Sequence, residues 1–225
     1  MWNKINVFQY QQMLPVLKIK DSTEQNAKLI SILYNLTENE VDNLSVELYL
    51  WYKISLDFLD KEITGKPVKY IKVKNKRYRC IYDIRNMPSG RYIESKVFSK
   101  DFANNIHKIC ASMVIPQRRN FIGIWKDEKW DASKHEEYAN DLLEANFAQV
   151  YHSILFFYHV YRNWMEVSKD YLIQKMIQAG MNHSEAKKEI LNLLSILDGN
   201  IVPKLLPTMK ISKLAKHMNS QRLTI

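Results

Sequence analysis

Residues 68–84 read VKYIKVKNKRYRCIYDI, and this stretch decides the fold class because its side chains follow a period of two. Apolar or aromatic residues alternate with polar neighbours on both sides of Lys74-Asn75-Lys76, as they do in half-buried strands. Asparagine tolerates the left-handed conformation that a tight hairpin turn requires. We therefore predict an antiparallel β-hairpin in an otherwise helical chain.

The sequence that follows the hairpin begins with a turn at Pro88-Ser89-Gly90. An isolated hairpin is only marginally stable. We therefore expect residues 91–98 to add a third strand. Residues 116–132 have neither period, and we interpret them as an irregular loop.

Helical spacing governs the chain on both sides of the hairpin. Before it, we predict helices over 6–17, from Ser22, over 37–43 and from Ser45 to about Glu62, the last with an apolar stripe that faces a core or a partner helix. After it, we predict helices over 101–115, 133–145, 147–167 and 169–179, and a last helix that begins near Asn182 and ends at Gly199. Capping boxes are predicted at Ser22, Thr37, Ser133 and Asn182.

The predicted fold is therefore mainly α (α+β), a helical domain with a small basic β-hairpin inserted between two helical halves. Residues 1–64 form the N-terminal helical part, and residues 65–98 form the hairpin insert. Residues 99–199 form the C-terminal helical part of the same domain. Residues 200–225, with two prolines and then a basic stretch, are expected to form an arm that orders only against a partner.

Charge is distributed unevenly along the chain. Residues 66–126 carry 15 basic and 3 acidic groups, whereas residues 1–65 carry 6 basic and 9 acidic groups. Residues 127–199 are also acidic, with 7 basic and 12 acidic groups, and residues 200–225 carry 5 basic groups and no acidic one. Basic segments meet phosphate or acidic protein surfaces. The side chains expected to make such contacts are Lys72, Lys74, Lys76, Arg77, Arg79, Arg118, Arg119, Lys210, Lys213 and Lys216.

Composition and motifs argue against an enzyme. The 225 residues include only 5 glycines, and neither a phosphate-binding glycine loop nor a nucleophile elbow is present. His107 and Cys110 share a predicted helical turn, but Cys110 belongs to the apolar stripe, which favours burial over reactivity. We expect no catalytic residue, no metal site and no cofactor. We also expect no secretion signal and no membrane-spanning segment.

Binding of single-stranded nucleic acid is an alternative that the hairpin leaves open. Residues 66–100 hold 11 basic and 2 acidic groups, with four tyrosines among them. Basic strands with exposed aromatic rings bind single strands by stacking over an electrostatic groove. Tyrosine in a strand is also common for packing alone.

The order of these segments resembles a known type of viral protein. The segments are YQQMLPV at 10–16, DSTEQNAKLISILYNLTENEVDNLS at 21–45, KNKRYRCIYDIRNMPSGRYIES at 74–95 and NNIHKICASMVIP at 104–116. Over about residues 8–165 the chain resembles tail-assembly chaperones and related morphogenesis proteins of tailed bacteriophages of Bacteroidales, including the crAss-like group. The resemblance implies a non-enzymatic protein and brings no catalytic residue with it.

The net charge of +9 bears on which member of this type the chain resembles. Chaperones of this type tend to be acidic, so the resemblance implies a basic component that stays in the virion, at the portal or head–tail region. Its implied partners are portal, neck or tail proteins and further copies of itself in a homo-oligomer, with non-specific contact to DNA. The alternatives are a tail-assembly chaperone absent from the mature particle and a single-strand nucleic-acid-binding protein.

Overall fold

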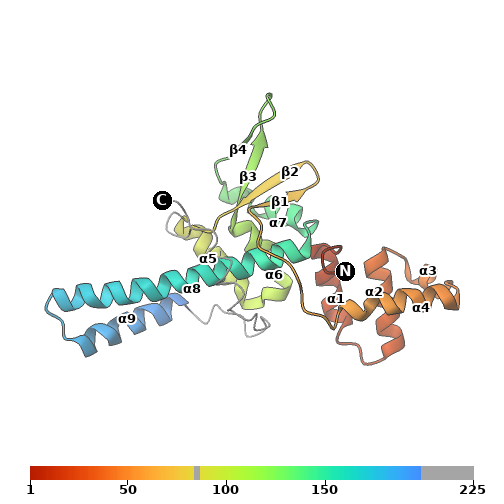
Figure 1. The fold of residues 1–225 in the computed structure, drawn as a ribbon, viewed down its shortest axis with the longest axis horizontal. Coiled ribbons are helices and arrows are strands. Elements are labelled where there is room, and N and C mark those ends of the chain that lie inside the picture. The colour runs from red at the N-terminus through yellow and green to blue at the C-terminus, as the bar shows by residue number, and fades with distance from the viewer. Residues whose placement is uncertain (84–86, 199–225) are drawn as a thin grey trace.

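The computed structural model describes residues 1–83 and 87–198. The fold is mainly helical with one small antiparallel sheet, so the predicted α+β class is confirmed. Helices from both halves of the chain pack below the sheet, one long helix runs to the side, and one hairpin of the sheet projects away from the body (Figure 1).

The N-terminal part consists of α1 (Val7–Val16), α2 (Ser22–Tyr34), α3 (Glu38–Asp42) and α4 (Val46–Ser55), followed by the 3₁₀ turn η1 (Leu56–Phe58). The capping box of Thr37 and Glu40 is confirmed, and Ser45 caps α4 by accepting a bond from the Leu48 amide. The box predicted at Ser22 is wrong. Asp21 caps α2 instead, because its carboxylate accepts the amides of Thr23 and Glu24.

The sheet has the order β1-β2-β3-β4, with strands β1 (Tyr70–Val73), β2 (Lys76–Cys80), β3 (Val114–Arg119) and β4 (Trp125–Asp127), all antiparallel. The predicted hairpin is confirmed as β1–β2. Its left-handed residue is Lys74, at φ 50°, rather than the asparagine beside it. The sheet is completed by residues 114–127, a stretch predicted in the main to be an irregular loop.

The third strand predicted at 91–98 is wrong, because residues Ser89–Phe98 form helix α5. Arg91 and Ser95, one helical turn apart, are both buried, whereas Ile93 and Val97 are exposed. The Arg91 guanidinium donates to the Val114 carbonyl, and burial lowers its pKa to about 10. This contact holds α5 against the start of β3. The sequence shows no apolar helical period over this stretch because the buried positions of α5 are polar.

The irregular loop predicted over 116–132 is wrong in part, because β3 and β4 include residues of this stretch. Pro116 suggests a break, yet it lies within β3 opposite Tyr78. Its carbonyl still accepts a hydrogen bond, from the Glu128 amide. A proline is tolerated in a strand where its missing N–H is not needed by a neighbour.

The C-terminal part contains the 3₁₀ turn η3 (Ser99–Asp101), α6 (Phe102–Ser112), the 3₁₀ turn η4 (Ala132–Lys134), α7 (His135–Leu143), α8 (Phe147–Gln178) and α9 (His183–Asp198). The helices predicted over 147–167 and 169–179 are one continuous helix, α8, which ends near Gly180 at φ 97°. Asp131, rather than Ser133, caps the turn before α7. At Asn182, where a capping box was predicted, the Asn182 side chain accepts the Glu185 amide and so caps α9. The predicted end at Gly199 lies outside the described residues.

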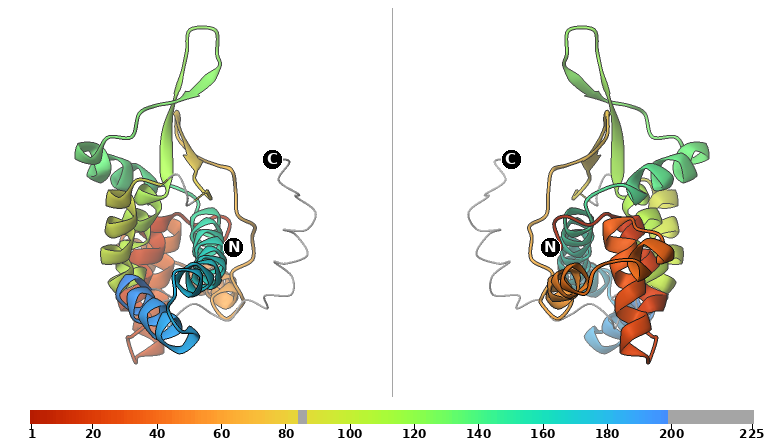
Figure 2. Two further views of the ribbon diagram at one scale, coloured as in Figure 1. Left: turned by 90° about the vertical axis from the view of Figure 1, so that its left-hand side faces the viewer. Right: turned by 90° about the vertical axis from the view of Figure 1, so that its right-hand side faces the viewer.

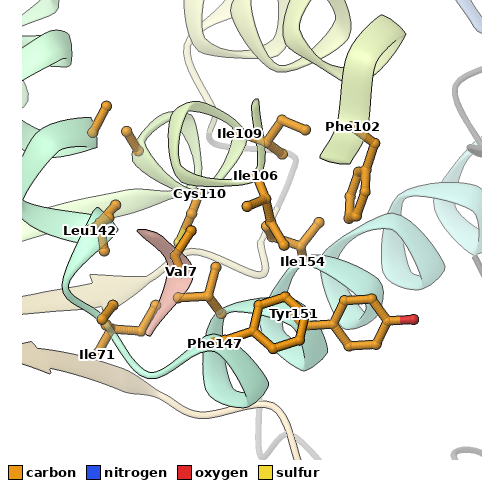
Figure 3. Packing of buried hydrophobic residues seen from close by; sticks show 14 of the residues in the cluster. Val7, Ile71, Phe102, Ile106, Ile109, Cys110, Leu142, Phe147, Tyr151 and Ile154 are labelled. Atoms are coloured by element: carbon orange, nitrogen blue, oxygen red, sulfur yellow. The ribbon is translucent and has the colours of Figure 1, made fainter. Parts of the chain in front are cut away.

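One hydrophobic core joins the N-terminal and C-terminal helices. Its buried members run from Ile5 to Met165 and come from α1, α2, α6, α7, α8 and the inner face of the sheet. Figure 3 shows Val7 of α1 and Phe147 and Ile154 of α8 in the same buried cluster as Ile106 of α6. The two helical halves therefore share one interior, while Ile173 of α8 packs with Ala186 and Ile190 of α9 in a second, smaller cluster.

A half-buried polar contact between α1 and α6 makes stability depend on pH. The Gln11 side chain donates to Nδ1 of His107 over 3.0 Å, so this nitrogen must be unprotonated. Burial lowers the pKa of His107 to about 4, from an ordinary 6.5. Stability at this site is full above pH 6.5 and is lost as the pH falls towards about 4, because the unfolded chain binds the proton first.

We predict that acidification through this window costs on the order of 1–2 kcal/mol at His107, after allowance for its partial exposure. Urea unfolding at pH 7.5 and pH 4.5 measures the loss. His107→Gln, which keeps an acceptor for Gln11, should show a smaller loss than the wild type. An equal loss in both proteins would assign the pH dependence to other groups, among them His152, whose pKa burial also lowers.

Candidate interaction surface on the sheet and its projecting hairpin

The two faces of the sheet differ in character. Ile71, Val73, Tyr78 and Cys80 lie on the inner face and are buried against the helices. The outer face carries the alternate residues, which pair across the strands in rows. The outer residues are Tyr70, Lys72, Arg77, Arg79, Ile115, Gln117, Arg119, Trp125 and Asp127. The basic residues predicted as contacts are therefore divided between two environments.

Three of the predicted contact residues are held in ion pairs within the chain. Lys74 lies 2.6 Å from Glu144. Lys76 lies 2.6 Å from Asp141 and 3.2 Å from Glu137, and Arg79 lies 2.6 Å from Asp127. The Arg79 guanidinium lowers the pKa of the Asp127 carboxyl. These ion pairs attach the β1–β2 hairpin to the end of α7 and to β4. The three cations therefore stabilise the fold and already have partners within the chain.

Arg77 occupies a different setting on the outer face. Its guanidinium stacks on the Tyr70 ring at 3.6 Å and lies 5.6 Å from the Trp125 ring. Both rings are partly exposed. Such a cation between two aromatic rings is the kind of surface on which a nucleobase can stack.

The remaining predicted residues have no ion-pair partner within the part of the chain that the structure describes. Lys72 and Arg118 are exposed. Arg119 is exposed as well, and its Nε donates to the Gly123 carbonyl over 3.2 Å. Lys210, Lys213 and Lys216 lie outside the described residues.

The tip of the β3–β4 hairpin is the feature that sequence reasoning missed. Phe121 is 99% exposed, Ile122 is 64% exposed and Ile124 is 55% exposed. Figure 2 shows this hairpin projecting well beyond the rest of the fold in both views. Three large apolar side chains are thus presented to solvent at the end of a narrow projection. In the sequence these residues belong to the apolar run FIGIW at 121–125, within the stretch interpreted as an irregular loop.

The turn at the tip is well defined. The Asn120 side chain accepts the Ile124 amide over 2.7 Å, and the Asn120 and Ile124 backbones are paired over 2.9 Å. Gly123 has φ 83°, a conformation that strongly favours glycine. The apolar side chains are therefore displayed on a formed turn, which lowers the entropy lost when a partner binds.

A second exposed apolar surface lies on α4. Val46 is 76% exposed, Trp51 is 60% exposed and Ile54 is 67% exposed, and Leu50 is about half exposed. The helix predicted to run to about Glu62 ends at Ser55, and α4 has no fully buried residue. Of the predicted stripe, Tyr52 packs partly buried against the core, Trp51 is exposed, and the buried Leu56 lies beyond the helix in η1. The other side of α4 is left uncovered by the described residues.

Groups that could support catalysis are buried or dispersed. Burial raises the pKa of the Cys80 thiol to about 11 and raises that of Cys110 well above its ordinary value. Over residues 1–83 and 87–198, no three His, Cys, Asp or Glu side chains are grouped closely enough to hold a metal ion. In the same residues, no helix combines the length and apolar character needed to cross a membrane.

Comparison with known proteins adds no further evidence, because no protein-family model, no curated protein and no solved structure matches this chain.

Proposed function

We propose that this chain is a non-enzymatic assembly protein that acts through protein–protein contacts. The observation that carries the proposal is the tip of the β3–β4 hairpin, where Phe121, Ile122 and Ile124 are exposed on a formed turn. Exposed apolar clusters mark interaction sites, and aromatic anchors supply much of the binding energy at interfaces. Three large apolar side chains exposed to water therefore indicate a surface that a partner covers.

The segment order of the sequence supports a more specific form of the proposal. Its resemblance to morphogenesis proteins of tailed bacteriophages favours a component of the virion at the portal or head–tail region, in a symmetric oligomer. The basic sheet fits that setting, because it can face acidic neighbouring proteins or the phosphates of exiting DNA. If the protein instead leaves before maturation, it acts as a tail-assembly chaperone.

Single-strand nucleic-acid binding is a second candidate, favoured by the stack of Arg77 on Tyr70 beside Trp125. A single-strand binder loses affinity steeply with salt, with log K falling linearly in log salt. It also depends on the stacked rings, so Trp125→Ala should weaken binding to an oligonucleotide.

A conditional knockout in the phage that encodes the chain tests the proposal. Loss of an assembly protein stops the formation of mature particles and leaves phage DNA synthesis unchanged. A plasmid that supplies the wild-type chain should restore the yield. Arrest of DNA synthesis would favour the nucleic-acid-binding function, and an unchanged yield of particles would contradict both.

A further inference from the structure

Two exposed apolar surfaces of this chain lie in segments of opposite net charge. The first is the hairpin tip, with Phe121 at its end. Residues 114–126 around it contain three basic groups and no acidic one. The second is the uncovered side of α4, where Val46, Leu50 and Ile54 recur every four residues and so share one face.

The N-terminal segment that carries α4 is acidic. Residues 21–62 contain nine acidic and three basic groups. Glu47 lies on the exposed side of α4 next to Val46, and Asp57 lies three residues beyond Ile54, with Lys53 as the one base on this helix. The hairpin offers exposed cations in return, since Arg118 and Lys126 are directly paired across β3 and β4 and project on the same side of the sheet.

The two surfaces lie at different ends of the molecule. In Figure 1, α4 is at the far right of the fold, whereas the β3–β4 hairpin points upward from the sheet. One copy therefore cannot bring its own hairpin to its own α4 without unfolding. Contact of α4 with α4, or of tip with tip, would place like charges together, which is unfavourable.

We propose that the hairpin tip of one copy docks on the α4 face of a second copy. Phe121 and its apolar neighbours then cover the Val46–Leu50–Ile54 stripe, while Arg118 and Lys126 face the acidic groups around it. Because the two surfaces are different, the contact is heterologous and repeats from copy to copy, so it builds a closed ring or a filament. The inference rests on the proposed function, since it names the self-contact of the proposed oligomer.

Photo-cross-linking of the full chain identifies the occupant of α4. A photoreactive amino acid replaces Ile54, and this protein is mixed with an isotopically heavy copy. We expect mass spectrometry to find cross-links from position 54 to residues 118–126 of the heavy copy. Cross-links to residues 200–225, or to α4 of the heavy copy, would overturn the inference, and so would an absence of cross-links between copies.

Charge reversal supplies an independent test by sedimentation velocity. The double variants Arg118→Glu/Lys126→Glu and Glu47→Lys/Asp57→Lys should each self-associate at least about tenfold more weakly than the wild type. An equimolar mixture should recover association, because every contact between the two variants pairs opposite charges. Lys187→Glu/Lys188→Glu on α9 makes the same charge change far from both surfaces and should have no effect.

Different results would contradict the docking of the hairpin on α4 and the assembly function. If every double variant associates like the wild type, the docking mode is wrong while the assembly function stands. If the knockout leaves particle yield unchanged, the assembly function fails irrespective of these associations.

Discussion

Replacing Phe147 with alanine is expected to lower the free energy of unfolding by about 3–5 kcal/mol. Phe147 is fully buried at the start of α8. Its ring stacks on Tyr10 of α1 at 3.9 Å and lies 5.7 Å from Trp2. The cavity left by alanine would therefore separate the N-terminal segment from the long helix.

The backbone around Phe147 prevents an easy collapse of that cavity. The Phe147 amide donates to the Ile5 carbonyl, and the Val7 amide donates to the Ala145 carbonyl, each over 3.0 Å. These bonds fix both walls of the site. Substitution costs are largest where the surroundings cannot move inward.

Phe121→Ala provides a matched control, since it makes the same chemical change at a side chain that is 99% exposed. It should change the free energy of unfolding by less than about 0.5 kcal/mol. Urea unfolding followed by circular dichroism measures both variants. A loss below about 1 kcal/mol for Phe147→Ala would contradict the shared core described above.

The second large effect is expected at the hairpin tip. A chain with Phe121→Ser, Ile122→Ser and Ile124→Ser should fail to restore particle yield in the knockout, with a loss of at least about a hundredfold in infectious particles. Truncation of two or more interface anchors commonly costs this much affinity. The thermal unfolding midpoint should stay near that of the wild type, because these side chains make little contact with the core.

Val167→Ser with Tyr171→Ser is the matched control for the tip variant. These side chains of α8 are 71% and 58% exposed, so the pair removes exposed apolar surface away from the hairpin. We expect this double variant to restore the yield. A tip variant that also restores the yield would show that the exposed tip has no role in assembly.

Much of the fold could be predicted from the sequence because local signals were strong. The period of two around residues 70–80 identified the first hairpin, and the cap at Thr37 placed α3. The failure at residues 91–98 has a physical cause. A third strand was predicted there, but Arg91 and Ser95 are buried and give α5 its inner side. The burial of a cation depends on tertiary contacts that a local pattern does not contain.

The candidate surface was predicted only in part, for a similar reason. Basic residues were grouped by sequence, yet Lys74 and Lys76 neutralise acids of α7 that lie more than 60 positions away. The tip was overlooked because residues 116–132 show neither the helical nor the strand period and were interpreted as an irregular loop. Only the pairing of β3 with β4 shows that Phe121 and Ile122 lie beyond the core, where no described residue can cover them.

The proposed function is tested most directly by quantitative mass spectrometry of purified particles from the phage that is proposed to encode the chain. An assembly protein of the virion should be present at a fixed copy number that matches a ring at the portal or head–tail region. That number should stay constant between preparations and under washes in high salt. Absence of the protein from particles, together with its abundance in infected cells, would contradict a structural role in the virion.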